Sequence, residues 1–524
     1  MNRPERWLTS PWRRGILAAL AGALPVFAFP APSLWWFAYV ALVPWILLVR
    51  SAPTAKGAAY DGWLGGLGFM LAVHHWLLPS LNVFTVVIAA LLGALWAPWG
   101  WLVRRFLGGV PSLGQVAAAL VVLPSGWLMV ELVRSWQGLG GPWGLLGSSQ
   151  WQVGPALRLA SVGGVWLLSF LVVTVNVAVA VLVSVRQARI PAVAGLVATA
   201  AATSAAWAWS PRPEVDGTTR IAVVQPGVVD GTDSIEKRFA REETLTRTLA
   251  GQDLDLIVWG ESSVGFDLAD RPDLADRIAA LARLTGADVL VNVDARRSDR
   301  PGIYKSSVLV GPQGPTGDRY DKMRLVPFGE YVPARSVLGW ATSVGKAAGE
   351  DRRQGTEQVV MNVGHGLRVG PMICFESAFP DMSRHLAQDG AEVLLAQSST
   401  SSFQNSWAPE QHASLAALRA AETGRSMVHA TLTGVSAVYG PSGERVGSWL
   451  GTDASTTMVY EVPVARGVTP FVRFGDWPVH AALLVLAVLC AAEGARAFRL
   501  RRPVPPPRVP PARTAHESPV RPGH

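Results

Sequence analysis

Long apolar runs alternate with short polar segments over the first 211 residues of the chain. Residues 15–49 contain no Asp, Glu, Lys or Arg, and residues 30–33, which include two prolines, divide them into two hydrophobic stretches. Each stretch is long enough to cross a bilayer of about 30 Å. Further apolar stretches follow at 57–78, 83–103, 115–133, 163–185 and 190–209, and a last one lies at 477–492. The pattern predicts about eight transmembrane helices.

Basic residues lie in every second loop of this predicted helical bundle. They precede the first helix and follow the second, fourth and sixth: Arg3, Arg6, Arg13, Arg14, Arg50, Lys56, Arg104, Arg105, Arg186 and Arg189. The alternate loops near Pro30 and Pro79 carry no charge. By the positive-inside rule the basic loops are cytoplasmic. The long polar stretch between the seventh and eighth helices is therefore expected to be extracytoplasmic.

The loop after the fifth helix begins with Glu131 and Arg134, which are close enough in sequence to meet on one helical face. We expect the two side chains to pair at the membrane edge, with Trp136 and Trp143 in the aromatic belt. The alternative is that this segment faces the substrate.

A globular composition begins near residue 212 and continues to residue 466. Buried strands are predicted for the apolar runs that begin at Ile221, Leu256, Asp288, Ser307, Leu367, Glu392 and Met427. Helices between them are expected to begin at Pro272, Pro380 and Pro409 and to end at Gly286, Gly390 and Gly424. Strands that alternate with helices favour an α/β or layered α+β sandwich.

Four segments follow from these patterns. They are a membrane domain of about seven helices at 1–211, a globular domain at 212–466, a last transmembrane helix at 467–495, and a tail at 496–524. The tail contains the run RRPVPPPRVPPAR, which is basic and rich in proline. Such a composition is typical of a disordered segment.

The composition supports a membrane protein and excludes several other classes. Of the 524 residues, 50% are hydrophobic and 16% are charged, and the mean hydropathy is +0.27. The net charge of +8 is spread over short clusters beside apolar runs, which fits membrane topology better than a nucleic-acid ligand. Cys374 and Cys490 are the only cysteines, so neither a disulfide framework nor a cysteine-based zinc site is expected.

Three reactive side chains each lie just after an apolar run. Glu261 lies in IVWGES, Lys322 in DRYDKMRLVPFGEYVP, and Cys374 in GPMICFES. A cysteine where a strand turns can expose its sulfur beside backbone N–H groups, an arrangement that suits acyl transfer. An ammonium group lowers the pKa of a thiol, and a carboxylate can accept its proton. Taken singly, each residue is more often structural, with the cysteine in a core and the charged residues on a surface.

Together the three segments resemble the nitrilase superfamily. RYDKMRLVPFGEYVP and ICFE resemble, over nearly their whole length, the apolipoprotein N-acyltransferase branch of that superfamily, and FVRFGDWP resembles the point where that family re-enters the membrane. The resemblance extends to about residue 502 and implies an αββα fold for the outer domain. It also implies Glu261 as general base, Lys322 as stabiliser of the thiolate and oxyanion, and Cys374 as nucleophile.

The resemblance implies supporting roles for three further residues, Glu330, Phe375 and Glu376. For the two glutamates a structural ion pair is the alternative to a direct catalytic role. The chain departs from the family pattern at Gly260, where proline is usual, and at Lys305, where asparagine is common. It departs again at SSTSSF, residues 398–403. Glycine is expected to loosen the turn before Glu261, and Lys305 to add a positive charge near the site.

Residues 327–354 are predicted to form a mobile cover over the site. The segment joins apolar residues, among them Phe328 and Trp340, to the Gly-rich and charged run GKAAGEDRRQG. It can therefore touch lipid while having little to hold it against a core. An ordinary surface loop is the alternative.

The activity implied by the resemblance is a two-step acyl transfer in the inner membrane of a bacterium. Cys374 takes an acyl chain from a phospholipid, and the α-amine of a diacylated lipoprotein then attacks the thioester. No metal or organic cofactor is implied, because the thioester conserves the acyl-transfer potential. The implied partners are the phospholipid donor, the lipoprotein and the bilayer. No nucleic-acid partner is implied.

Two alternatives to this activity stay open. One is a membrane-tethered amidase or nitrilase-type hydrolase, which has no need of a seven-helix scaffold. The other is a transporter or lipid-binding scaffold with an inactive outer domain. It is disfavoured because Glu261, Lys322 and Cys374 are all present, and because His74 and His75 are as compatible with packing as with function.

Overall fold

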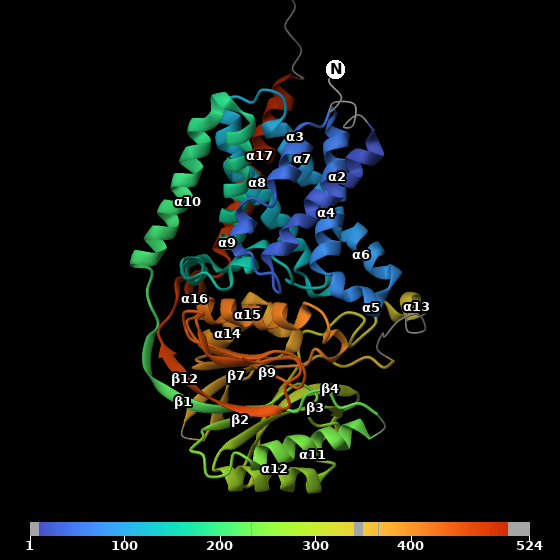
Figure 1. Ribbon diagram of the computed structural model, residues 1–524, viewed down its shortest axis with the longest axis vertical. Coiled ribbons are helices and arrows are strands. Elements are labelled where there is room, and N and C mark those ends of the chain that lie inside the picture. The colour runs from blue at the N-terminus through green and yellow to red at the C-terminus, as the bar shows by residue number, and fades with distance from the viewer. Residues whose placement is uncertain (1–9, 232, 340–348, 365, 501–524) are drawn as a thin grey trace, which may run out of the picture.

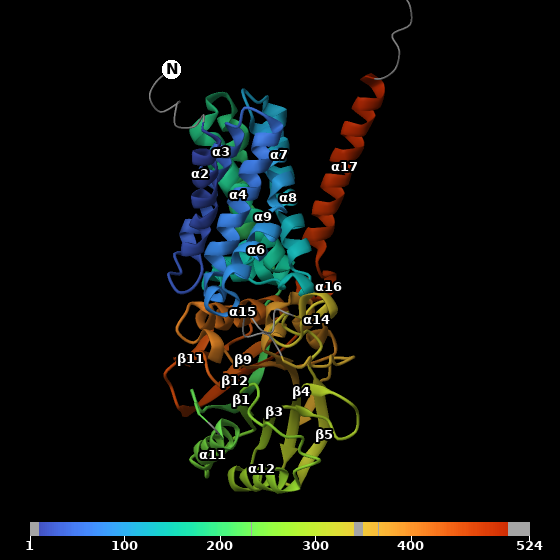
Figure 2. The same cartoon turned by 90° about the vertical axis from the view of Figure 1, so that its right-hand side faces the viewer.

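The computed structural model describes residues 10–231, 233–339, 349–364 and 366–500. An elongated helical part stands on an α/β part, and the chain returns to the helical part with its last helix (Figures 1 and 2). The predicted disordered tail lies almost entirely outside the described residues. Only its start, 496–500, is described, and it continues the last helix.

The helical part is built from ten α-helices and short 3₁₀ turns within the described residues. The α-helices are α2 (Pro11–Ala23), α3 (Val43–Arg50), α4 (Ala55–Val73), α5 (Leu78–Leu81), α6 (Val83–Gly93), α7 (Trp96–Leu107), α8 (Leu113–Arg134), α9 (Gly154–Ser184), α10 (Arg189–Trp209) and α17 (Trp477–Leu500). These segments coincide with the predicted apolar stretches.

The predicted count of about eight spans is not confirmed. Among the described residues, four helices, α8, α9, α10 and α17, are long and apolar enough to cross a membrane. Two bent pairs, α4 with His75–Leu81 and α6 with α7, raise this number to six if each pair is one span. The apolar stretch at Trp35–Arg50 is shorter, because it is split between a 3₁₀ turn and α3.

Close helix packing in this part depends on small residues. A Cβ on Gly22 would lie 1.9 Å from the carbonyl oxygen of Gly65, and a Cβ on Gly68 would lie 1.9 Å from that of Ala19. The backbones of α2 and α4 therefore touch, as is common where helices meet in a membrane. A buried ion pair between Arg14 and Asp61, at 2.6 Å, joins the same two helices.

The α/β part contains two six-stranded sheets formed by the described residues. The first has the order β12 (Thr456–Arg466), β1 (Glu214–Gln225), β2 (Leu256–Trp259), β3 (Asp288–Arg296), β4 (Ile303–Gly311) and β5 (Gly314–Asp321). The second has the order β11 (Arg445–Leu450), β10 (Ser436–Tyr439), β9 (Ser426–Thr431), β8 (Val393–Ser398), β7 (Leu367–Ile373) and β6 (Met361–Val363).

The two sheets pack face to face, and helices cover their outer faces. Apolar side chains of both sheets, such as Val223, Val258, Ile373 and Leu395, form one buried core between them. Helices α11 (Ser234–Arg247) and α12 (Pro272–Thr285) cover the first sheet, and α14 (Pro380–Gln388) and α15 (Ala408–Thr423) cover the second. The predicted αββα sandwich is confirmed, with α14 and α15 between a sheet and the helical part (Figure 1).

Helix α15 joins the two parts through a buried ion pair. Arg419 and Glu422 lie within 2.7 Å and are almost fully buried. Glu422 accepts a hydrogen bond from the backbone N–H of Val165, just after α9 leaves helical geometry at Gly164. Arg419 donates to the carbonyl oxygen of Ala378, in the turn that begins at Cys374. The orientation of the α/β part is thus tied to α9.

The predicted pairing of Glu131 with Arg134 at the membrane edge is wrong. Both are buried, and instead of an ion pair with each other they bind other groups of the described chain. Glu131 accepts hydrogen bonds from Trp127 and from the N–H of Leu146. Arg134 donates to the carbonyl oxygens of Trp143 and Gly144.

The expected place in the aromatic belt is wrong for Trp143 and stays a prediction for Trp136. Trp136 is 65% exposed, whereas Trp143 is buried and donates a hydrogen bond to Gln411 of α15. Trp143 therefore belongs to the contact between the helical part and the α/β part.

Replacing Gly68 by valine should separate α2 from α4, because the new side chain has no space beside Ala19. We expect the melting temperature of the detergent-solubilised protein to fall by about 4 °C or more, in line with the overpacking of a tight contact. Gly494→Val in α17 is the matched control, since a Cβ there meets no atom within 4 Å. Equal melting temperatures for the two variants would contradict this packing.

Candidate active site

Cys374 lies where β7 ends and a short 3₁₀ turn, Cys374–Ala378, begins. Its φ angle is +53°, a left-handed conformation that non-glycine residues seldom adopt. Two side chains that the sequence did not single out hold this turn. His412 of α15 contacts the carbonyl oxygen of Cys374 through Nε2 at 3.1 Å, and Ser377 donates to the same oxygen at 2.9 Å. The turn is fixed from both sides while the thiol stays partly exposed.

Glu261 follows β2, at the edge of the first sheet that faces the second. Its N–H donates to the carbonyl oxygen of Ser398 at the end of β8, 3.1 Å away, so the two sheets are joined beside the carboxylate. The expectation that Gly260 loosens this turn is wrong. A Cβ there would lie 1.9 Å from the N atom of Leu432, and glycine is required by the close approach of the two backbones.

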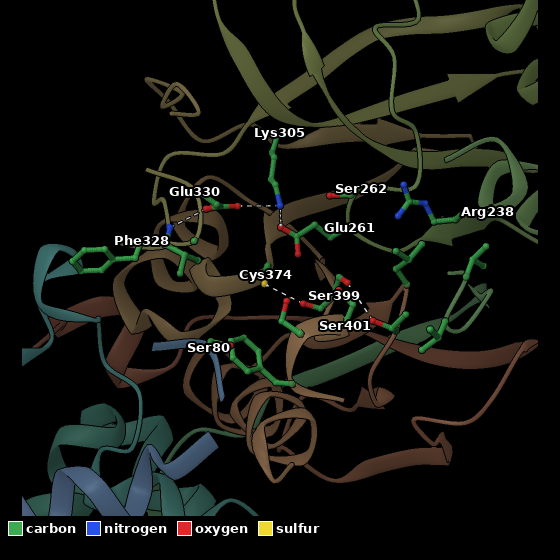
Figure 3. A pocket seen from close by; sticks show the side chains of 18 of the residues that line it. Ser80, Arg238, Glu261, Ser262, Lys305, Phe328, Glu330, Cys374, Ser399 and Ser401 are labelled. Carbon is green, nitrogen blue, oxygen red and sulfur yellow. Dashed lines mark hydrogen bonds and ion pairs between the residues drawn. The ribbon is translucent and has the colours of Figure 1, made fainter. Parts of the chain in front are cut away.

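Lys322 and Glu330 lie on the segment that follows β5. The Lys322 ammonium is fully buried, 2.7 Å from Glu330 Oε1 and 3.2 Å from Glu261 Oε1. Lys305 on β4 reaches the same two carboxylates, at 3.0 Å and 2.7 Å. Two ammonium groups therefore alternate with two carboxylates, and the expected extra positive charge of Lys305 lies inside the site (Figure 3). We call these four side chains the charge cluster.

The charge cluster fixes which groups are ionised. Burial raises the pKa of Glu261, but the positive charges of Lys305 and Lys322 lower it further, so that the net pKa is about 2. Burial and the negative charge of Glu261 raise the pKa of Cys374 to about 12, against the opposite effect of the two lysines. At neutral pH the site holds a protonated thiol next to an ionised carboxylate, the state that a general base requires.

Glu376 has a structural role in the described contacts, although not as part of an ion pair. One of its carboxylate oxygens accepts hydrogen bonds from the hydroxyl of Tyr320 and from the N–H groups of Met323 and Arg324. The other accepts from the N–H of Ile373. Glu376 thus clamps the backbone just after Lys322, and the side chain of Tyr320 just before it, to the end of the strand that precedes Cys374.

Cys374 and three members of the charge cluster open into a cavity of about 530 Å³. Glu261, Lys305 and Glu330 line it, together with Phe328 and with Ser401 to Phe403 from the divergent SSTSSF segment. Leu77, Ser80 and Leu81 at the lower end of the helical part close one side. We call this cavity the catalytic cleft; it lies at the junction of the two parts.

The remaining predicted residues lie elsewhere. Phe375 is not part of the lining; its ring packs edge-on against Phe379, with 4.9 Å between the ring centroids, and faces the helical part. Trp340 lies outside the described residues. The described residues contain no group of three or more His, Cys, Asp or Glu side chains that could hold a metal ion.

Replacing Glu376 by glutamine should loosen the clamp, because one acceptor oxygen becomes an NH2 donor facing backbone N–H groups. We expect the alkylation rate of Cys374 by iodoacetamide to change at least threefold and the melting temperature to fall by several degrees, since unmade buried hydrogen bonds cost about 1–3 kcal/mol. The exposed Glu357→Gln is the control. A Glu376 variant that behaves like the control would show that the clamp influences neither the reactivity of Cys374 nor the stability of the protein.

The comparison with known proteins agrees with the two-part architecture. Residues 21–178 match the model of the apolipoprotein N-acyltransferase N-terminal domain, and residues 220–468 match that of carbon-nitrogen hydrolases. An amidase from Nesterenkonia sp. AN1 aligns with 49% of this chain and 93% of its own, with 18% identity and a TM-score of 0.35.

Full-length relatives include apolipoprotein N-acyltransferases of two bacteria. The apolipoprotein N-acyltransferase of Azotobacter vinelandii is 31% identical over 96% of this chain and 99% of its own length. The apolipoprotein N-acyltransferase of Geobacter metallireducens is 30% identical over 91% of this chain and 95% of its own length. The chain belongs to the apolipoprotein N-acyltransferase family, within the carbon-nitrogen hydrolase superfamily.

Proposed function

We propose that this chain moves a fatty acyl chain from a phospholipid, through a thioester on Cys374, to the α-amine of the N-terminal S-diacylglyceryl-cysteine of lipoproteins. The observation that carries the proposal is the position of the thiol. Cys374 lies beside Glu261 in a cleft bounded on one side by the helical part. A lipid can reach such a site without leaving the membrane surface.

The first half-reaction loads Cys374. The thiol sulfur attacks the ester carbonyl of the donor, and Glu261 accepts the thiol proton as the S–C bond forms. Negative charge then moves to the carbonyl oxygen, near the ammonium groups of Lys322 and Lys305. When the C–O bond breaks, Glu261 returns the proton to the leaving alkoxide, and a lysophospholipid departs.

The second half-reaction uses the same groups in the opposite direction. The neutral amine of the lipoprotein attacks the thioester carbonyl, and Glu261 accepts a proton from the amine nitrogen. The C–S bond breaks, the proton passes to the sulfur, and Cys374 is restored. Lys322 is suited to stabilise both oxyanions because Glu261 and Glu330 fix its ammonium group from two sides.

A membrane-tethered hydrolase is the second candidate, and the catalytic cleft disfavours it. Three residues of the cleft, Leu77, Ser80 and Leu81, come from a helical part that a soluble amide would not require. An apolar wall beside the thiol fits an acyl chain. The same wall limits the access of water that would hydrolyse the thioester.

The arrangement in the cell forms part of the proposal. Following the basic loops, we place the α/β part outside the cytoplasmic membrane and the last helix across it, with the domain limits 1–211, 212–466 and 467–495. The segment around Phe328, which lines the cleft, is proposed to cover the site between the two half-reactions.

Replacing Cys374 by serine should abolish N-acylation, because a serine hydroxyl beside Glu261 is a far weaker nucleophile than the thiol. The matched control is Cys490→Ser, whose thiol is exposed on α17 and has no part in the cleft. Mass spectrometry of a lipoprotein N-terminal peptide from cells that depend on each variant measures the outcome. Loss of the third acyl chain in both variants, or in neither, would refute the assignment.

Replacing Lys322 by arginine should lower the acyl-transfer rate by about 100-fold or more, a loss typical of removing one oxyanion donor. The guanidinium keeps the charge but does not fit the closed space between Glu261 and Glu330. Lys56→Arg, at an exposed position on α4, is the control. Both variants should insert into membranes equally. A rate near wild type for Lys322→Arg would mean that charge alone is needed.

A further inference from the structure

A second cavity, of about 620 Å³, lies at the junction of the two parts and shares no lining residue with the catalytic cleft. Its walls come from the first turns of α9, the end of α10 and the hairpin between β10 and β11. Figure 1 shows α10 descending along the edge of the helical part to the start of β1. We call this the arginine cavity.

The lining of the arginine cavity carries uncompensated positive charge. Arg158 of α9, Arg212 after α10 and Arg445 of β11 line it, and none of the three forms an ion pair with any residue that the structure describes. Glu444 is the one carboxylate in the described lining, and it accepts a hydrogen bond from the N–H of Ser442. Three guanidinium groups face a cavity with one opposing charge.

Buried donors around the same cavity lack acceptors. Arg158 is only 7% exposed, and its Nη2 donates to the carbonyl oxygen of Ser210, but its Nε has no hydrogen-bond partner among the described residues. The same holds for Nε1 of Trp151, another residue of the lining. Buried polar groups are nearly always paired, and a ligand in the cavity would provide these two side chains with acceptors that the described residues do not.

The start of α9 adds to the attraction for an anion. The helix begins at Gly154, which lines the cavity, and its N-cap residue, Val153, provides no side-chain acceptor. The N–H groups of Gly154 and Ala156 have no acceptor within the helix, and Pro155 between them has no N–H. The two N–H groups present to the cavity the positive end of the first segment of α9, which keeps helical geometry up to Val162.

We propose that the arginine cavity binds a phosphate group, carried by an anionic phospholipid of the surrounding membrane. A phosphate offers several acceptor oxygens to guanidinium, indole and backbone N–H donors at once. A lipid is favoured as its carrier because Trp207, 48% exposed at the end of α10, lines the cavity together with Trp151. Tryptophans at this level are typical of the interface between lipid tails and head groups.

A phosphate in this position bridges the two parts of the molecule. Arg158 belongs to the helical part, Arg445 belongs to the second sheet, and Arg212 lies on the segment that joins them. Bound phosphate relieves the repulsion among the three arginines and links α9 to β11. The lipid thereby stabilises the orientation of the α/β part at the membrane surface.

The test compares thermal unfolding of the full chain in nanodiscs of phosphatidylcholine with unfolding in nanodiscs that also contain phosphatidylglycerol. We expect phosphatidylglycerol to raise the wild-type melting temperature by about 3–6 °C, as for a ligand that binds only the folded state. In Arg212→Gln/Arg445→Gln most of this rise should vanish. Both arginines are exposed and make no described hydrogen bond, so the variant should fold.

A matched double variant, Arg283→Gln/Arg300→Gln, removes one exposed charge from α12 and one from the loop after β3, neither of them in the cavity lining, and should keep the full rise. The alkylation rate of Cys374 should be the same in both double variants, which separates this site from the catalytic cleft. In a third arm, millimolar inorganic phosphate is added to phosphatidylcholine nanodiscs. A rise there of equal size would identify free phosphate as the ligand, whereas no rise would identify the lipid.

The proposal would be overturned if neither phosphatidylglycerol nor phosphate stabilised the wild type. It would also be overturned if Arg212→Gln/Arg445→Gln kept the same rise as the control variant. Direct binding gives an independent readout. Native mass spectrometry should show about a fivefold loss of phosphatidylglycerol affinity for each arginine removed.

Discussion

Four charges beside one thiol set the conditions that the α/β part must meet. Glu261, Glu330 and Lys322 are buried, Lys305 is 13% exposed at its side chain, and each ammonium group lies within 3.2 Å of both carboxylates. Removing one member leaves an uncompensated buried charge, which costs about 3–5 kcal/mol. The end of β2, strand β4 and the segment after β5 must therefore stay together. The Glu376 clamp and the glycine contact at Gly260 serve the same requirement, since they fix the backbones that carry these charges.

The helical part meets the α/β part through α15, and this contact reaches the reacting centre. His412 and Arg419 of α15 each bind a carbonyl oxygen of the turn that contains Cys374. Glu422, which pairs with Arg419 one turn earlier on the same helix, accepts a hydrogen bond from the N–H of Val165 at the break in α9. These hydrogen bonds and the ion pair thus connect a long apolar helix to the turn that contains Cys374. The catalytic cleft and the arginine cavity lie along this junction, where a membrane surface would meet the protein.

Much of the fold could be predicted because its strongest signals are local. All seven predicted strands and the three predicted helices of the α/β part are present, since their apolar runs lie between the two sheets and prolines and glycines bound the helices. Strands β5, β6, β11 and β12 were missed because they expose one face, and β10 because its run SAVY is less apolar than the equally short LIVW of β2. Helix α11 was missed because most of its residues are polar.

The sequence motifs identified the residues that come together in the site, but not the contacts that hold them in position. Spacing suggested that Glu131 and Arg134 would pair, yet their partners are backbone groups of a loop, which no periodicity reveals. The roles of His412 and Ser377 depend on contacts between distant segments. Lys305 could be recognised as an added charge, but only the fold shows that it touches Glu261 and Glu330.

The central claim is that acyl transfer passes through Cys374, activated within the charge cluster. The purified protein, mixed with a phospholipid of known acyl composition and no lipoprotein, should accumulate an acyl group on the peptide that contains Cys374. Neutral hydroxylamine should remove this group, and adding a diacylated lipopeptide should discharge it to the peptide amine. An acyl group found on another residue, or transfer to the lipopeptide in a single turnover without any acylated Cys374, would contradict the account.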